Sequence, residues 1–431
     1  MADGFIDAKV GQTAMTDRNT KQSQPPLSED ATRRILLSLI ADEQEKLIKK
    51  GAVSPGRALA AQSLGLTKAQ IGQMAIDEDQ LGFDSLSRLD LVLRVNRFFQ
   101  LHSSGVDDYL LIRRTIGDWV DLVMQHHALC EGNVQFTFLT SGSTGDPKPI
   151  THDLCALQAE VRGLSEGPNP IIPTGGRIIA LVPPHHIYGF LFSCLLPSLT
   201  GAEVISLYQQ SPTRCLALAQ AGDVVIATPY LWDKLAQSGL QFSPGVHGVT
   251  SGAPATTTTW SAVTQTQLAT MTEVYGATET GGVGFRTALD DPFELLPHLA
   301  VTDGQVHHDG LTGLRLDLQD RLHWVGAGRF DVLGRLDDTV QVAGVNVSPQ
   351  HVAREIAKIT GVKSVDVRLR DDRLHALIVP SHPDDATEAI AQRIRDHMDQ
   401  NLAAPARPAT LTFRPSRPCN DLGKLLDWTT S

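Results

Sequence analysis

The segment Thr140-Ser-Gly-Ser-Thr-Gly-Asp-Pro-Lys148-Pro149 follows an apolar run over residues 134–139. A loop rich in glycine, serine and threonine exposes backbone N–H groups and hydroxyls without side-chain bulk, which suits the oxygens of a polyphosphate. Lys148 adds a positive charge beside these groups. The common P-loop ends in Gly-Lys-Ser/Thr at the start of a helix, whereas here prolines flank the lysine on both sides. The segment therefore predicts a phosphate-binding loop of a different kind.

Three later segments carry side chains suited to nucleotide chemistry. They are Tyr275-Gly-Ala-Thr-Glu279, Gly334-Arg-Leu-Asp337 and Pro418-Cys-Asn-Asp-Leu-Gly-Lys424. One such segment alone would indicate little, because clusters of glycine, serine and threonine are usually ordinary turns. The four segments in this order resemble the adenylate-forming enzymes, which include acyl- and aryl-CoA synthetases, the adenylation domains of nonribosomal peptide synthetases, and luciferase. The resemblance covers about residues 134–428.

This resemblance implies an ATP-dependent acid–thiol ligase. A substrate carboxylate attacks the α-phosphorus of ATP to give acyl-AMP and pyrophosphate, and a thiol of CoA or of a phosphopantetheinyl carrier protein then takes the acyl group. The protein's task in such a reaction is to position the reactants and to stabilise charge on phosphoryl oxygens. Aromatic or short-chain acids are expected, because the chain ahead of the phosphate loop is too short to build a long acyl tunnel.

By this resemblance, several residues are expected to bind ATP and magnesium. The β- and γ-phosphates are assigned to Thr140, Ser141, Gly142, Ser143, Thr144, Gly145 and Lys148. Tyr275, beside Gly276, is expected to stack on adenine, Thr278 to reach the α-phosphate, and Glu279 to hold Mg²⁺. Magnesium favours few carboxylates together with phosphate oxygens. A lone glutamate is otherwise most often a solvated surface residue.

Two further segments complete the expected nucleotide site. Ser251, Gly252, Ala253 and Pro254 resemble the loop that borders adenine, although such a sequence is also an ordinary turn. Asp320 lies 15 residues before Arg335, the separation at which the family places its ribose-binding aspartate. A carboxylate can accept hydrogen bonds from both ribose hydroxyls. Leu318-Gln319 stands where the family has Thr-Gly before this aspartate. Arg335 is the cationic residue that the family pairs with it in the nucleotide site, and Asp337 is expected to be the hinge between the large and small domains.

The acyl site and the catalytic lysine are inferred from the same resemblance. The segment Pro183-Pro-His-His-Ile-Tyr-Gly189 is similar to the edge of the acyl pocket, where His186 would place the carboxylate and His185, Tyr188 and Phe190 would shape the surroundings. Adjacent histidines are otherwise common surface or core residues. Lys424 is expected on a mobile loop of the small domain, where it would bridge the carboxylate, the ribose and the α-phosphate.

The hydrophobic pattern divides the chain into four parts: a polar, disordered tail over 1–27, an all-helical region over 28–128, an α/β core domain over 134–335, and a small α+β domain over 336–431. Helices are expected over 31–50, 86–99 and 116–124, with Leu86, Leu89, Leu91, Leu93 and Val95 facing the core. Buried parallel strands are expected over 134–139, 177–182, 202–207, 223–227 and 273–275. In the small domain, strands are expected over 339–342, 364–369 and 374–379, and helices over 350–359 and 386–402.

The helical region is similar to an acyl carrier protein. Asp84-Ser85-Leu86 opens the second helix, and Thr115-Ile-Gly-Asp follows 30 residues after the serine. Phosphopantetheine on Ser85 would place its phosphate against the unpaired N–H groups at a helix start. The alternative is that Asp84-Ser85 is a plain helix cap that needs no chemistry.

Two departures from the family pattern leave alternatives open. The family normally has a longer α/β subdomain ahead of the phosphate loop, so the helices either replace it structurally or leave a shortened acyl-binding domain. Asn346 stands near the position of the arginine that usually follows Lys-x-x-Gly-Phe, which weakens the case for a contact with CoA phosphate and favours a carrier-bound thiol. The rival from another functional class is a carrier or scaffold protein with a degenerate adenylation domain.

Composition limits the remaining possibilities. The 431 residues are 42% hydrophobic and carry a net charge of −11, which argues against a general nucleic-acid or anionic-membrane binder. The five cysteines are scattered and predict neither a disulfide framework nor a zinc site, and a reducing cytoplasm fits them best. Neither a signal peptide nor a membrane span is expected.

Overall fold

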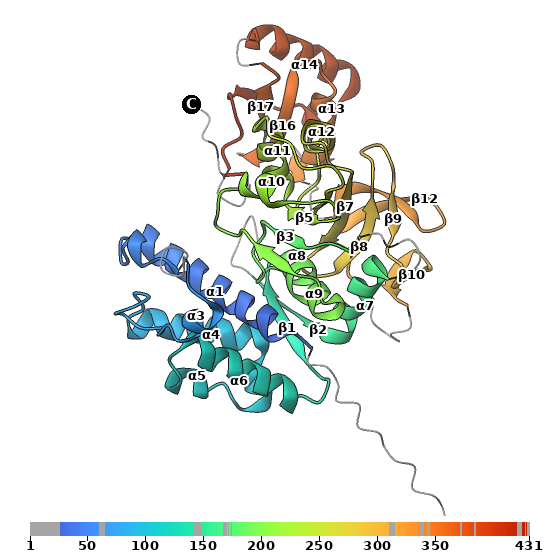
Figure 1. The fold of residues 1–431 in the computed structure, drawn as a ribbon. Coiled ribbons are helices and arrows are strands. Elements are labelled where there is room, and N and C mark those ends of the chain that lie inside the picture. Colours follow the sequence, from blue (N-terminus) through green and yellow to red (C-terminus); the bar gives the residue numbers. More distant parts are fainter. Residues whose placement is uncertain are drawn as a thin grey trace, which may run out of the picture.

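The structure is a computed structural model, and it comprises a helical region, a large α/β domain and a small C-terminal domain. In Figure 1 the helices lie at one end of the molecule and the small domain at the other, with the large sheet between them. The structure describes residues 26–59, 65–140, 148–166, 170, 172–173, 175–309, 315–336, 340–342, 345–370, 373–382, 385–419, 425–426 and 428.

The helical region begins immediately after the polar N-terminal segment. Its helices are α1 (Glu29–Lys49), α3 (Lys68–Gly72), α4 (Ser85–Phe99), α5 (Tyr109–Ile112) and α6 (Ile116–Leu129), with 3₁₀ turns at Pro55–Arg57 and Leu101–Ser104. Ser28 caps α1 by accepting a hydrogen bond from the Ala31 N–H at 3.2 Å. The three long helices expected from the sequence are confirmed. The boundary of the tail was wrong by a residue or two, because Leu27 is fully buried.

The expected inward face of α4 was partly wrong. Leu91 and Val95 are buried as predicted, whereas Leu86, Leu89 and Leu93 are 69%, 41% and 52% exposed. The bulky aromatic pair at the end of the helix sets its rotation, since Phe98 and Phe99 share one face with Leu91, Val92 and Val95. At 100° per residue, the three exposed leucines fall on the opposite side of the helix.

The large domain is built on a sheet of nine described strands in the order β12-β13-β9-β8-β7-β6-β5-β3-β4. Five neighbours run parallel: β4 (Val204–Ser206), β3 (Ile178–Ala180), β5 (Val224–Ala227), β6 (His247–Thr250) and β7 (Thr270–Ala277). Four antiparallel strands extend the sheet: β8 (Gly281–Arg286), β9 (Phe293–Leu295), β13 (Arg329–Arg335) and β12 (Asp320–Gly326). The α/β class is confirmed.

Helices cover both faces of this sheet. One side carries α7 (Leu154–Ser165), α8 (Ile187–Phe190), the π-helical turn Leu191–Leu195 and α9 (Leu196–Thr200), and the other carries α10 (Arg214–Leu218), α11 (Pro229–Gln237) and α12 (Thr257–Gln265). Successive residues of β5 alternate between the two cores, which explains the continuous apolar runs in the sequence. Among the helices described, none is long and apolar enough to cross a membrane.

The first expected strand lies outside the large sheet. β1 (Gln135–Leu139) pairs antiparallel with β2 (Pro149–Asp153) as a separate hairpin, so its expected place among parallel strands was wrong. Its inner side chains nevertheless pack into the main core, because Phe136 and Phe138 are fully buried. A second hairpin, β10 (Leu299–Thr302) with β11 (Gln305–His308), is also separate from the large sheet, and its Leu299 and Val306 are buried in the main core.

The helical region and the large domain share one hydrophobic core. Phe98 of α4 contacts Phe138 and Phe190 of the large domain, with ring centroids 5.4 and 6.1 Å apart, and Phe136 lies 4.7 Å from Phe190. The same continuous cluster includes Ile35, Leu36 and Trp119 from the helices and Ile178 and Val224 from the sheet. The helices therefore cover one face of the large domain instead of forming a core of their own.

The small domain has a separate core and the expected α+β composition. Its elements are the hairpin β14 (Val340–Val342) with β15 (Val345–Val347), α13 (Pro349–Ala357), β16 (Val362–Arg370), β17 (Arg373–Pro380), α14 (Thr387–Asn401) and β18 (Thr410–Phe413). β17 pairs with β16 on one side and, in parallel, with β18 on the other. The expected strands and helices are confirmed, and β15 and β18 were not anticipated.

Candidate functional site

Three of the segments predicted to form the site lie at or just beyond the carboxyl ends of parallel strands. The segment 181–186 leaves β3, Ser251 follows β6, and Tyr275 lies near the end of β7. The Tyr188 hydroxyl marks this edge, since it lies 3.3 Å from the carbonyl oxygen of Ala227 and 2.9 Å from that of Val249. In open α/β sheets, ligands bind outside the carboxyl ends of the strands.

The β1–β2 hairpin holds both ends of the predicted phosphate loop. The Thr140 N–H donates to the Lys148 carbonyl at 2.9 Å, and the Lys148 N–H donates to the Thr140 hydroxyl at 3.0 Å. Lys148 is exposed beside this junction. Five predicted phosphate contacts lie outside the described residues: Ser141, Gly142, Ser143, Thr144 and Gly145.

His152 connects this hairpin to the predicted nucleotide segment. Its Nε2 lies 2.6 Å from the carbonyl oxygen of Thr278. Burial lowers the pKa of His152, so the ring is neutral at pH 7, and Nε2 must carry the proton because a carbonyl only accepts. No sequence pattern indicated this contact, since the two residues are 126 positions apart. It ties the base of the phosphate loop to the residue expected to reach the α-phosphate.

A tight β7–β8 hairpin presents Thr278 and Glu279. A Cβ on Gly276 would lie 2.2 Å from the carbonyl oxygen of Gly281, so only glycine permits this close approach of the two strands. Thr278 is half-buried, and Glu279 is exposed in the turn. The described residues contain no cluster of three or more acidic, histidine or cysteine side chains that could hold a metal. A single exposed carboxylate fits a magnesium ion that takes its remaining ligands from phosphate and water.

The predicted adenine and ribose contacts are neighbours. The Tyr275 hydroxyl donates to Asp320 Oδ2 at 2.6 Å, and the tyrosine ring packs near Phe293 and Phe330. Asp320 lies directly opposite Arg335 in the β12–β13 register, which accounts for their spacing in the sequence. The side chain of Arg335 lies outside the described part of the chain.

A buried ion pair anchors the predicted adenine loop. The Ser251 hydroxyl donates to the Val274 carbonyl at 2.7 Å. At the other end of the loop, the Ala255 N–H donates to Glu273 Oε1 at 2.8 Å, while Arg286 Nε lies 2.7 Å from Glu273 Oε2. Gly252, Ala253 and Pro254 are exposed between these anchors. The Glu273–Arg286 pair was missed from the sequence, because charged residues in a strand usually face solvent.

A second unexpected carboxyl lies behind the β7–β8 turn. Glu160 of α7 is fully surrounded, and its Oε1 accepts a hydrogen bond from the Gly282 N–H at 2.9 Å. A Cβ on Gly281 or Gly282 would come within 2.5 or 2.4 Å of the Glu160 oxygens, so both glycines make room for the carboxyl. Burial raises the pKa of Glu160 to about 7. The hydrogen bond from Gly282 lowers the pKa, but by less than burial raises it.

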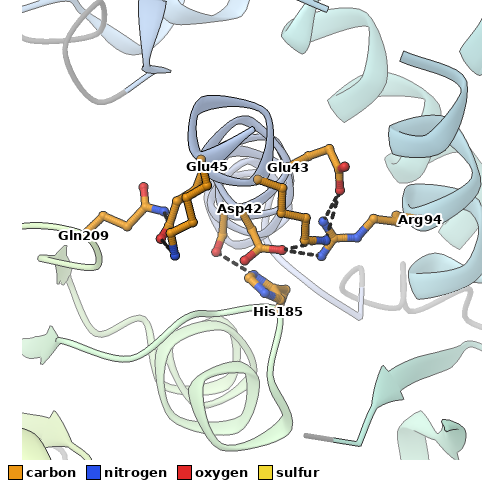
Figure 2. Close-up of polar contacts among 9 residues, drawn as sticks. Asp42, Glu43, Glu45, Arg94, His185 and Gln209 are labelled. Atoms are coloured by element: carbon orange, nitrogen blue, oxygen red, sulfur yellow. Dashed lines mark hydrogen bonds and ion pairs between the residues drawn. The ribbon is translucent and has the colours of Figure 1, made fainter. Parts of the chain in front are cut away.

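The predicted acyl-site histidines lie in a turn before α8. His186 is the N-cap residue of α8, and its N–H donates to the Pro183 carbonyl at 3.1 Å. A Cβ on Gly189 would lie 2.1 Å from that carbonyl oxygen, which explains the glycine. His185 is buried against α1 (Figure 2). Phe190, expected to shape the acyl pocket, is fully buried in the shared core.

The predicted catalytic lysine and hinge, Lys424 and Asp337, lie outside the described residues. The segment that contains Lys424 is bracketed by an antiparallel bridge between Cys419 and Leu425. Its flank is held to β16, because Arg368 donates to the Leu425 carbonyl at 3.3 Å and stacks over the Trp428 ring at 4.6 Å.

Comparison with protein families matches residues 75–303 to the family described as AMP-binding enzyme. The chain belongs to this family. It is 42% identical over 404 residues to a 4-coumarate–CoA ligase of Cereibacter sphaeroides, covering 93% of this chain and 97% of that protein. It is 41% identical over 399 residues to a 4-coumarate–CoA ligase of Rhodobacter capsulatus, covering 92% of this chain and 99% of that protein.

Solved structures agree on the fold of this AMP-binding enzyme. ATP-bound MatB from Rhodopseudomonas palustris superposes with a TM-score of 0.56 at 16% identity, covering 90% of this chain and 91% of that one. The prediction of an adenylate-forming acid–thiol ligase is confirmed. The family match begins at residue 75, ahead of α4, so α4 and α6 belong to the family segment, and the comparisons give no support to a separate carrier domain.

Substitution of Glu160 tests the cost of its burial in this AMP-binding enzyme. Because the pKa of Glu160 is higher in the folded state, its protonated form favours folding. This contribution to the free energy of unfolding is fully present below pH 4.5 and is lost as the pH rises through about 7. This loss amounts to about 3 kcal/mol at 1.4 kcal/mol per pKa unit. Glu160→Gln keeps an acceptor for Gly282 and has no charge to bury. We expect its free energy of unfolding, measured by urea denaturation, to fall less between pH 5 and pH 8 than that of the wild type.

The exposed Glu166, at the end of the same helix, provides the matched control. Glu166→Gln should retain the pH dependence of the wild type. If Glu160→Gln also retained it, the raised pKa of Glu160 would be refuted.

Proposed function

We propose that this protein converts an aromatic acid of the 4-coumarate type into its CoA thioester through an acyl-AMP intermediate. The observation that carries the substrate assignment is 42% identity, over 93% of the chain, to a protein named 4-coumarate–CoA ligase. A second relative with the same name is 41% identical over 92% of the chain.

The proposed ATP site lies along the carboxyl edge of the sheet. Tyr275 and Asp320 would contact adenine and ribose, and their 2.6 Å hydrogen bond supports a shared nucleotide site. The 140–148 loop would hold the β- and γ-phosphates, and Thr278 would reach the α-phosphate. Glu279 would hold Mg²⁺, which supplies charge neutralisation on the phosphate oxygens when bound. The His152–Thr278 hydrogen bond supports the proximity of these two parts.

In the proposed adenylation step, the acid lies beside His186 with its carboxylate directed at the α-phosphorus. Lys424 would approach from the small domain and stabilise the negative charge shared by carboxylate and phosphate. Asp337 would be the hinge about which the small domain rotates after adenylation, so that a different face of it meets the active site during thioester formation. Both residues are proposed from the sequence motifs alone.

CoA is the proposed acyl acceptor, because the names of both relatives specify it. Asn346 stands near the position where the family usually has an arginine that would contact a phosphate of CoA. Other residues would therefore have to bind the CoA nucleotide.

A carrier role for Ser85 is the second candidate. Ser85 is exposed at the first position of α4, where a phosphate could accept backbone hydrogen bonds. Against it, Asp84 already accepts from the Ser87 N–H at 2.8 Å as an ordinary N-cap.

The central assay is acid-dependent exchange of pyrophosphate into ATP, followed by thioester formation with CoA. We expect activity with 4-coumarate or a related aromatic acid. Lys424→Ala should slow exchange at least about a hundredfold, the scale for loss of a preorganised transition-state charge. Lys358→Ala, which removes an exposed small-domain lysine paired with Glu355, should have little effect. Exchange at the wild-type rate in Lys424→Ala would refute the lysine assignment.

Intact-mass spectrometry tests the carrier candidate. After incubation with CoA and a broad-specificity phosphopantetheinyl transferase, modification would add about 340 Da, with the phosphate at this helix start. We expect no added mass and full CoA-dependent activity in Ser85→Ala. An added mass that disappears in Ser85→Ala would instead establish the carrier role.

A further inference from the structure

Helix α1 reaches from the helical region to the turn that carries the proposed acyl-site histidine. The Ser38 hydroxyl lies 2.7 Å from His185 Nδ1. Both side chains are buried, with 4% and 8% of their surfaces exposed. Figure 2 shows His185 facing α1 from the segment that precedes α8. The contact joins residues 147 positions apart and crosses between the helical region and the large domain.

Charged residues one turn along α1 fix the orientation of this helix. Arg94 of α4 donates to Asp42 Oδ2 at 2.7 Å and to Glu43 Oε2 at 2.6 Å (Figure 2). Lys46 lies 3.5 Å from Asp42 and 3.2 Å from Glu43. Although burial acts to raise it, the Arg94 guanidinium holds the pKa of Asp42 below its ordinary value. The planar guanidinium engages two carboxylates at once, which restricts rotation of α1 about its axis.

The ring of His185 lies against that of His186. The two imidazole rings have centroids 4.7 Å apart and an interplanar angle of 56°. Burial holds the pKa of His185 well below its ordinary range, so its ring is neutral. In a neutral imidazole one nitrogen donates a hydrogen bond and the other accepts one, and here Nδ1 bonds the Ser38 hydroxyl. The ring of Tyr208 lies 6.2 Å away on another side. A buried ring bounded in this way cannot turn without losing the Ser38 hydrogen bond.

We propose that Ser38 is a positioning residue for the acyl site: its hydroxyl fixes the ring of His185, and His185 in turn supports His186 where the acid binds. The inference rests on the proposed function, because it uses the acyl-site role of His186. It gives the helical region a part in substrate binding. The Arg94 clamp on Asp42 and Glu43 sets the position from which Ser38 acts.

The test compares Michaelis constants for the aromatic acid and for ATP. Ser38→Ala should raise KM for the acid about fivefold or more, the scale of one buried hydrogen bond, and leave KM for ATP within about twofold. Ser38→Thr retains the hydroxyl and should restore most of the acid KM. Arg94→Lys keeps the charge but loses the two-pronged geometry, and should raise the acid KM as well.

Thr32→Val is the matched control. Thr32 is another buried hydroxyl of α1, but its contact is with Met124 of α6, 3.5 Å away. This variant should leave the acid KM unchanged even if it lowers the melting temperature as much as Ser38→Ala. If the wild type is active and Ser38→Ala has the same KM for the acid as the wild type, this inference is overturned but the proposed function is not. The same holds if Ser38→Ala raises KM for ATP as much as KM for the acid. A wild type inactive with every aromatic acid would overturn the proposed function and this inference together.

Discussion

The apolar contact of the helical region with the β1–β2 hairpin and α8 of the large domain is the interaction on which the rest of the structure depends. Phe98 from α4 meets Phe138 and Phe190 from the large domain within a continuous cluster. Burial of each aromatic side chain contributes about 1.5–3 kcal/mol. Removal of the helices would expose Phe138 and Phe190, against which Phe98 packs. The helices therefore belong to the same hydrophobic core as the large domain.

This packing also determines what the site can contain. With α4 fixed in the core, Arg94 holds α1, and α1 presents Ser38 to His185. The other site elements come from the carboxyl edge of the sheet, where Tyr275 and Asp320 are joined by a hydrogen bond. The proposed acyl side of the site is thus bounded by the helical region, and the proposed nucleotide side by β7 and the antiparallel strands beyond it.

The sequence predicted those features that depend on local pattern. Strands such as β5 were recognisable because both of their faces are buried, and the spacing of Asp320 and Arg335 reflects direct pairing across two strands. Pattern could not predict contacts between distant segments, such as Glu160 with Gly282, 122 residues apart. The inward face of α4 was misjudged for a related reason: it was assigned from the leucines along the helix, whereas the buried face is the one that carries Phe98 and Phe99.

Native-state hydrogen exchange of Phe98→Ala tests most directly whether the helices and the sheet form one cooperative unit. If they share one core, amides of α1 and of β5 should open with the same free energy, and the substitution should lower both by about 3–5 kcal/mol. Leu93→Ala, on the exposed face of the same helix, should lower neither by more than about 0.5 kcal/mol. Loss of protection in α1 with unchanged protection in β5 would contradict the account and show that the helices fold as an independent domain.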